Sequence, residues 1–282
     1  MSEAAWYIIL TGALIAASCA LLGSFLVLRR MAMVGDAISH SVLPGIVIAF
    51  LISGSRDNLP MLLGAAALGV FTTLMIEFLH RKAQLQTDAS IGITFTWLFA
   101  IGVILISSFT GQVDLDQDCV LYGEIAYVPL DLWYSASGQS LGPRATWIAG
   151  GLFLVVLSYI IIGFRGLKLT TFNPEYAKSL GIHNQVWHLS FMSLVSVTTV
   201  LAFESVGAIL IVALLVVPAA TAYLLSKKLI PLLLLAVLFG LISAVLGYLL
   251  ADAINGSIAG AMVTVAGILF AGAFVFSRVA RS

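Results

Sequence analysis

Long apolar runs separated by short polar turns dominate this sequence from end to end. Each run is roughly 20 residues long, the length of a helix that crosses a bilayer. The runs lie at 6–28, 33–53, 60–79, 90–109, 146–164, 186–203, 206–225, 230–250 and 257–277. The short alternating segments typical of a membrane barrel are absent. The pattern predicts an all-α integral membrane protein with a single domain over residues 1–282, a polytopic bundle of nine spans, or eight if two adjacent runs form one broken span.

Composition supports this prediction and excludes other classes. The chain is 61% hydrophobic and only 9% charged, whereas soluble domains carry about 25% charged residues. The net charge is zero and no basic tract exists, so nucleic-acid binding has no electrostatic basis. Cys19 and Cys119 are too few and too far apart for a disulfide framework or a cysteine metal cluster.

The distribution of basic residues predicts the orientation. If the turn at Arg29 and Arg30 is cytoplasmic and the runs alternate, 11 of the 13 basic residues fall on the cytoplasmic side. The N-terminus is then outside and the C-terminus inside. The largest outer segment, 111–145, carries five acidic residues and is either a docking face that also attracts cations or an ordinary solvated loop.

Two ionisable residues stand out within the second apolar run. Asp36 and His40 are four residues apart and share one face if the segment is helical. Pro44 deprives the His40 carbonyl of its helical donor, so Pro44 and Gly45 are expected to break the helix. A charge inside a membrane helix costs about 2.5–3.5 kcal/mol on insertion scales, which makes the pair a functional hypothesis.

One carboxylate oxygen and one imidazole nitrogen suit Mn(II), Zn(II) or Fe(II) better than Ca or Mg. Two ligands are too few for a stable site, but a twofold dimer with the pair at its axis would supply four. On residues alone an alternative stays open, in which Asp36 caps a helix and His40 satisfies a backbone carbonyl.

A short polar helix is predicted within the longest inner segment, over about 173–182. Asn173 is a suitable N-cap, Pro174 and Glu175 suit the first turn, and Gly181 is placed to end the helix. The helix is either a cytoplasmic docking element or a simple connector.

A second proline-containing run loosely repeats the layout of 34–44. In 206–221, a Val-Gly pair again precedes a proline by about ten residues, which is typical of an internal repeat but can arise by chance. Gly207 and Pro218 are therefore further helix-break candidates.

Two common enzyme motifs are absent. The sequence has neither the phosphate loop Gly-x-x-x-x-Gly-Lys nor the pair His-Glu-x-x-His. Glu77 and His80 precede two basic residues and are interpreted as a cytoplasmic helix end. His183 and His188 are interpreted as interfacial residues.

Several segments together resemble a known family. Met33-Val-Gly-Asp-Ala-Ile-Ser-His-Ser-Val-Leu-Pro-Gly45 is similar to the signature of the membrane permease of bacterial ABC importers for manganese, zinc and iron. Further similar segments follow in the family's order and spacing and extend over nearly the whole chain, at 87–93, 100–107, 174–181 and 206–222.

The resemblance implies a homodimeric, multi-pass permease of the type II importer fold in the bacterial cytoplasmic membrane. Asp36 and His40 would face the path of the transported metal, and no cofactor would be bound permanently. An extracytoplasmic metal-binding protein would deliver the ion. A separate cytoplasmic ATPase dimer would hydrolyse ATP and dock on the short helix, whose coupling residues are Asn173, Pro174, Glu175, Tyr176, Ala177, Lys178, Ser179, Leu180 and Gly181. The competing hypothesis is a secondary, proton-coupled metal carrier.

Overall fold

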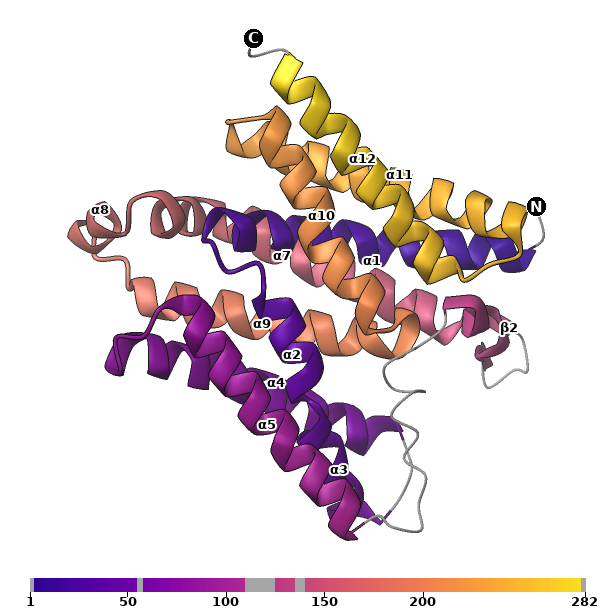
Figure 1. The fold of residues 1–282 in the computed structure, drawn as a ribbon, viewed down its shortest axis with the longest axis horizontal. Helices are drawn as coiled ribbons and strands as arrows, with labels where there is room; N and C mark the ends of the chain where they lie inside the picture. The colour runs from indigo at the N-terminus through magenta and orange to yellow at the C-terminus, as the bar shows by residue number, and fades with distance from the viewer. Residues whose placement is uncertain (1–2, 55–57, 110–124, 135–139, 280–282) are drawn as a thin grey trace. The chain divides into compact units, whose positions relative to one another are not determined.

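The structure is a computed structural model that describes residues 3–54, 58–109, 125–134 and 140–279 (Figure 1). These ranges contain nine segments long and apolar enough to cross a membrane. They coincide with the nine apolar runs of the sequence, so the prediction of an all-α, multi-pass membrane protein is confirmed. That the chain forms a single domain stays a prediction.

Helices make up most of the described chain, and one short antiparallel hairpin joins β1 to β2. The elements are α1 (Glu3–Leu28), α2 (Val34–Ser41), α3 (Leu43–Ser53), α4 (Asn58–Lys82), α5 (Thr87–Phe109), η1 (Ile125–Leu130), β1 (Leu132–Tyr134), β2 (Ser140–Pro143), α7 (Arg144–Phe172), α8 (Pro174–Ser179), α9 (Asn184–Val206), α10 (Ala208–Leu225), α11 (Leu229–Ile254) and α12 (Ile258–Val279).

Two segments differ from the expected outline. Helix α7 continues to Phe172, beyond the apolar run that ends near residue 164. The hydropathy of the sequence shows only which part of a helix suits lipid, whereas the helical hydrogen bonds continue into the polar residues that follow. The outer segment 111–145 is described only at 125–134 and 140–145, where it holds η1, the hairpin and the start of α7. Four of its five acidic residues lie outside the described residues.

The chain divides into two compact units. The first contains Met1–Ala32, Leu121–Gly163 and Ala202–Ser282, and its centre is α1, which packs against α10 and α11. At Gly23 the two backbones of α1 and α10 lie so close that a Cβ would collide with the Leu215 carbonyl. Membrane helices have no hydrophobic driving force for association, so small residues at such crossings stabilise them by allowing close packing.

The second unit contains Met33–Val120 and Phe164–Leu201, and it holds the residues singled out in the sequence. Helices α3 and α4 approach closely where Gly45 faces Gly64, since a Cβ on either glycine would meet the other's carbonyl oxygen. The Ser41 and Thr72 hydroxyls are fully buried and lie 2.7 Å apart, which joins the end of α2 to α4.

The expected break before Pro44 is present. Helix α2 ends at Ser41 and α3 begins at Leu43, with Pro44 in its first turn. Gly45 lies inside α3, where it provides space for Gly64 rather than a break.

The two break candidates near α10 have different outcomes. Gly207 separates α9 from α10 with a φ of 78°, which favours glycine. The break expected at Pro218 does not occur, because α10 continues through it. A buried proline deep in a helix removes only one backbone donor, and membrane helices tolerate this loss. The layouts of 34–44 and 206–221 therefore differ at their prolines.

Replacing Gly23 with alanine should lower the free energy of unfolding by about 1–3 kcal/mol, the usual cost of overpacking. The matched control is Gly267→Ala in α12, where no atom lies within 4 Å of an added Cβ. That variant should be neutral or stabilised by up to about 1 kcal/mol through helix propensity. Thermal unfolding in detergent compares the two, and equal midpoints would contradict the close α1–α10 crossing.

Candidate functional site

Helix α2 places Asp36 and His40 on one face, as their spacing predicts. His40 Nε2 lies 3.6 Å from Asp36 Oδ1, within reach for electrostatic attraction but beyond hydrogen-bond distance. Their side chains keep 34% and 36% of their accessible surface, respectively, whereas the other six residues of α2 are buried. Within the described residues, the most accessible face of α2 therefore carries both ionisable groups.

The local sequence explains why this short helix holds that orientation. Val34 and Ile38 are fully buried and lie one turn apart on the opposite side of α2. Asp36 lies in the first turn of α2, the end of the helix dipole that favours a carboxylate, and His40 lies in the last turn. The Ser39 hydroxyl donates to the Gly35 carbonyl at 2.9 Å and needs no other partner.

Two aromatic rings from α5 lie beside the His40 imidazole. The ring centroids of Phe95 and Phe99 are 6.1 and 6.0 Å from that of His40, and Phe99 meets it edge to face. Such contacts restrict the ring's orientation while leaving its nitrogens available. Sequence reasoning missed both residues, because their spacing in α5 shows a shared helix face but not which helix lies opposite.

The alternative is that Asp36 caps a helix and His40 satisfies a backbone carbonyl, and the described contacts of α2 do not show either role. The N-cap of α2 is Met33, and no side chain caps this helix. Within the described residues, the recorded contacts of the two side chains are with each other and with the two phenylalanines. No group of three or more potential metal-binding side chains forms in the same ranges. The pair thus offers two ligands and an open face.

The predicted short polar helix is present as α8, and its caps are those expected. Asn173 Oδ1 accepts a hydrogen bond from the Tyr176 amide at 3.1 Å, and Pro174 occupies the first turn. At the other end Gly181 adopts a φ of 77°, and the Ile182 amide donates back to the Ala177 carbonyl at 3.0 Å.

Most of α8 faces away from the rest of its unit. Ala177 is fully buried and anchors the helix, whereas Glu175, Tyr176 and Leu180 are exposed. Asn184 Nδ2 donates to the Pro174 carbonyl at 2.6 Å, which fixes the start of α8 to the start of α9. An exposed apolar and aromatic surface on a firmly capped helix is suited to binding another protein.

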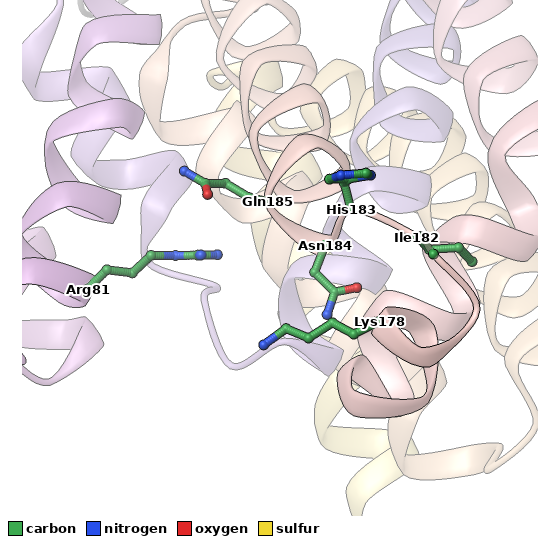
Figure 2. Close-up of a pocket in the computed structure, with 7 residues that line it drawn as sticks. Arg81, Lys178, Ile182, His183, Asn184 and Gln185 are labelled. Carbon is green, nitrogen blue, oxygen red and sulfur yellow. The ribbon is translucent and has the colours of Figure 1, made fainter.

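A hollow of about 400 Å³ opens beside α8. Figure 2 shows the Arg81 and Lys178 side chains extending toward one another from opposite sides of it, with His183 above them. Its lining consists of Arg81, Lys178, Gly181, Ile182, His183, Asn184 and Gln185. The hollow therefore contains basic and amide side chains and no carboxylate.

A polar cluster around the buried Glu77 joins α4 to α9, and sequence reasoning missed it. Glu77 is only 7% exposed; it pairs with Arg81 one turn later and with His188, whose Nε2 is 2.8 Å from Glu77 Oε2. Helix α4 ends at Lys82, which agrees with the interpretation of Glu77 as part of a helix end; that this end is cytoplasmic and that His188 is interfacial stay predictions. The sequence contains the Glu77–Arg81 spacing, but the partner from α9 appears only in the folded unit.

Comparisons with known proteins agree over nearly the whole chain. The family model described as the ABC 3 transport family matches residues 1–277. The manganese transport system membrane protein MntD of Bacillus subtilis is 47% identical over 279 residues, which cover 98% of this chain and 93% of MntD. The zinc transport system membrane protein TroD of Treponema pallidum is 41% identical over 270 residues, 96% of this chain and 73% of TroD.

A solved structure also matches. PsaBC from Streptococcus pneumoniae, in complex with a Fab, shares 30% identity with a TM-score of 0.77, and the match covers 97% of this chain and 92% of that one. This likeness confirms the permease fold expected from the sequence.

Replacing Asn173 with alanine should destabilise α8 by about 1 kcal/mol, because the Tyr176 amide loses its acceptor. Asn173→Asp is the matched control, since a carboxylate still accepts that hydrogen bond. Hydrogen exchange of the amides in α8 measures the difference. Faster exchange in the alanine variant alone is expected, and equal exchange in both variants would contradict the capping role.

Proposed function

Because this chain belongs to the ABC 3 transport family, we propose that it is the membrane permease of an ATP-driven importer that moves a divalent transition-metal ion into the cytoplasm. Its relatives include membrane proteins of a manganese and a zinc transport system, which supports manganese or zinc as the cargo, and iron is included from the resemblance seen in the sequence. The observation that carries the proposal is that the most accessible face of α2 presents Asp36 and His40 together. The family supports ATP-driven import over the proton-coupled alternative.

The metal ion is a substrate in transit, and two copies of the chain hold it. One copy supplies a carboxylate oxygen and an imidazole nitrogen, which leaves a transition metal short of its usual four or more ligands. A twofold axis beside the open face of α2 brings two such pairs together. The ligand set of two Asp36 and two His40 side chains then favours Mn(II), Zn(II) or Fe(II) over the all-oxygen preference of Ca and Mg.

ATP is hydrolysed on a separate cytoplasmic subunit, since the sequence has no phosphate-binding loop of the Gly-x-x-x-x-Gly-Lys type. A pair of these ATPases docks on α8, whose exposed Glu175, Tyr176 and Leu180 form the contact surface. With the N-terminus outside and the C-terminus inside, α8 lies on the cytoplasmic side of the bacterial inner membrane.

The transport cycle is alternating access. An extracytoplasmic binding protein delivers the ion, the paired Asp36 and His40 side chains hold it briefly, and movement of α8 on ATP hydrolysis opens the inward route. Each step needs a difference in affinity between the outward and inward states, because a ligand shifts a conformational equilibrium only by its differential binding.

The variants Asp36→Asn and His40→Ala should each reduce metal uptake by about tenfold or more, because losing a ligand from each copy removes half of the four-ligand set. Asp88→Asn, which neutralises an exposed carboxylate in the first turn of α5, is the control and should transport normally. The measurement is uptake into proteoliposomes that contain the permease and its ATPase, with ATP inside and the metal-loaded binding protein outside.

Uptake by both α2 variants at the rate of the unmodified protein would remove Asp36 and His40 from the path. Uptake that needs a proton gradient but no ATP would instead favour the secondary carrier.

The variant Leu180→Asp should weaken binding of the ATPase by about 2 kcal/mol or more, since it places a charge in the apolar part of the contact. Ala83→Asp adds the same charge at the exposed turn after α4 and should leave binding unchanged. The measurement is the amount of ATPase that co-purifies with each variant. An intact complex with Leu180→Asp would show that α8 is not the docking element.

A further inference from the structure

Glu77 is buried and contacts the exposed Arg81 and the partly buried His188, and this cluster lies between α8 and α2 along the contacts described below. We propose that Glu77 is a positioning residue that transmits the movement of α8 to α2 through α4. This inference rests on the proposed function, since it assigns a role within the ATP-driven transport cycle. It is carried by a chain of contacts that all lie within the second unit of the protein.

The first link joins α8 to the start of α9. Asn184 donates to the Pro174 carbonyl at 2.6 Å, and the Ile182 amide donates to the Ala177 carbonyl at 3.0 Å. These bonds close the short connection between the two helices at both of its ends. A displacement of α8 therefore carries the first turn of α9, and with it His188, one turn after Asn184.

The second link joins α9 to α4. His188 and Arg81 both pair with the Glu77 carboxylate, but only His188 comes from a different helix. Glu77 is 7% exposed, and removing a partner from a buried charge is strongly unfavourable. A second contact between the helices lies about two turns before Glu77, where a Cβ at Gly69 of α4 would collide with the Ser196 side chain of α9. The two helices are therefore in contact at Glu77 and again at Gly69, and in the proposal a displacement of α9 passes to α4 through these contacts.

The third link joins α4 to the metal-bearing helix. Thr72 precedes Glu77 by five residues, about 7.5 Å along the helix axis, and its hydroxyl lies 2.7 Å from that of Ser41 at the end of α2. The contact of Gly45 with Gly64 adds a close backbone crossing between α3 and α4. A shift of α4 therefore acts on the break between α2 and α3, beside Asp36 and His40.

Arg81 lies between α8 and Glu77, because it lines the hollow beside α8 and also contacts Glu77. Arg81 lines the hollow opposite Lys178 (Figure 2) while its guanidinium pairs with Glu77. Space at this point means that α8 does not push on the end of α4 directly. In the proposal, the polar contact of His188 with Glu77 is therefore the connection nearest α8 through which docking moves α4.

A purely local role makes a different prediction. If Glu77 only neutralised Arg81 at the end of α4, loss of His188 would leave that pair intact and transport would proceed normally. A variant of His188 therefore distinguishes the two roles, whereas a variant of Glu77 does not. The ratio of ATP hydrolysed to metal imported also distinguishes them, because a purely stabilising role would leave this ratio unchanged.

The experiment uses the reconstituted complex of permease, ATPase and binding protein. The variants are Glu77→Gln, His188→Gln and the double variant, with His80→Gln as the control: His80 lies on the same helix, is exposed and contacts the Leu85 carbonyl. For each single variant at positions 77 and 188, the ATP consumed per metal ion imported should rise by about fivefold or more, the usual lower range of coupling between sites. Co-purification of the ATPase should be unchanged.

The double variant should be no worse than either single variant, because the two side chains act as one link. The His80→Gln ratio should equal that of the unmodified protein. If Glu77→Gln does not fold, His188→Gln provides the same test, since it keeps the Glu77–Arg81 pair.

A normal ratio in folded His188→Gln, or strictly additive effects in the double variant, would overturn the inference. Absence of ATP-driven uptake by the unmodified complex would instead contradict the proposed function, so the two failures are distinguishable.

Discussion

A charge enclosed by apolar helices must have an opposite charge or a polar partner within reach, and this requirement governs where the functional groups of the permease lie. Glu77 meets it inside its own chain, with Arg81 and His188 as partners. Asp36 and His40 meet it only in part, because they lie 3.6 Å apart on the most accessible face of α2. The same constraint thus gives a cluster that joins two helices and, in the proposed function, a pair that a transported metal ion completes.

Close backbone crossings make the polar contacts effective. In lipid, helices gain no hydrophobic energy from touching one another, so glycine crossings and hydroxyl contacts determine which helices stay together. The crossing of Gly45 with Gly64 and the contact of Ser41 with Thr72 hold α2, α3 and α4 as one group. Because packed interiors change between discrete arrangements rather than deforming smoothly, such a group can carry a displacement from one end to the other. A loosely packed bundle would absorb the same displacement in side-chain rearrangements.

Much of this fold could be predicted from the sequence, because its strongest signals are local. Hydropathy gives the nine spans, Asn173 and Gly181 give the caps of α8, and the spacing of Asp36 and His40 gives their shared face. The misses share a different cause. Pro218 looks like a break, yet its helix continues because the surrounding turns keep their own hydrogen bonds. The contact of His188 with Glu77 joins residues more than 100 positions apart in the sequence, and Phe99 contacts His40 from another helix. Neither contact has a local pattern.

In the proposed function, the incompleteness of the α2 pair is itself a functional property. A resident metal site needs four or more ligands in a fixed geometry and a supporting second set of hydrogen bonds, and such a site would retain the ion. A transport site must bind the ion well enough to accept it and weakly enough to release it. Dividing the ligands between two copies satisfies both conditions, since a small change in their separation converts a four-ligand site into two weak pairs. The half-exposed Asp36 and His40, with aromatic rings rather than further ligands beside the imidazole, have the arrangement that this mechanism requires.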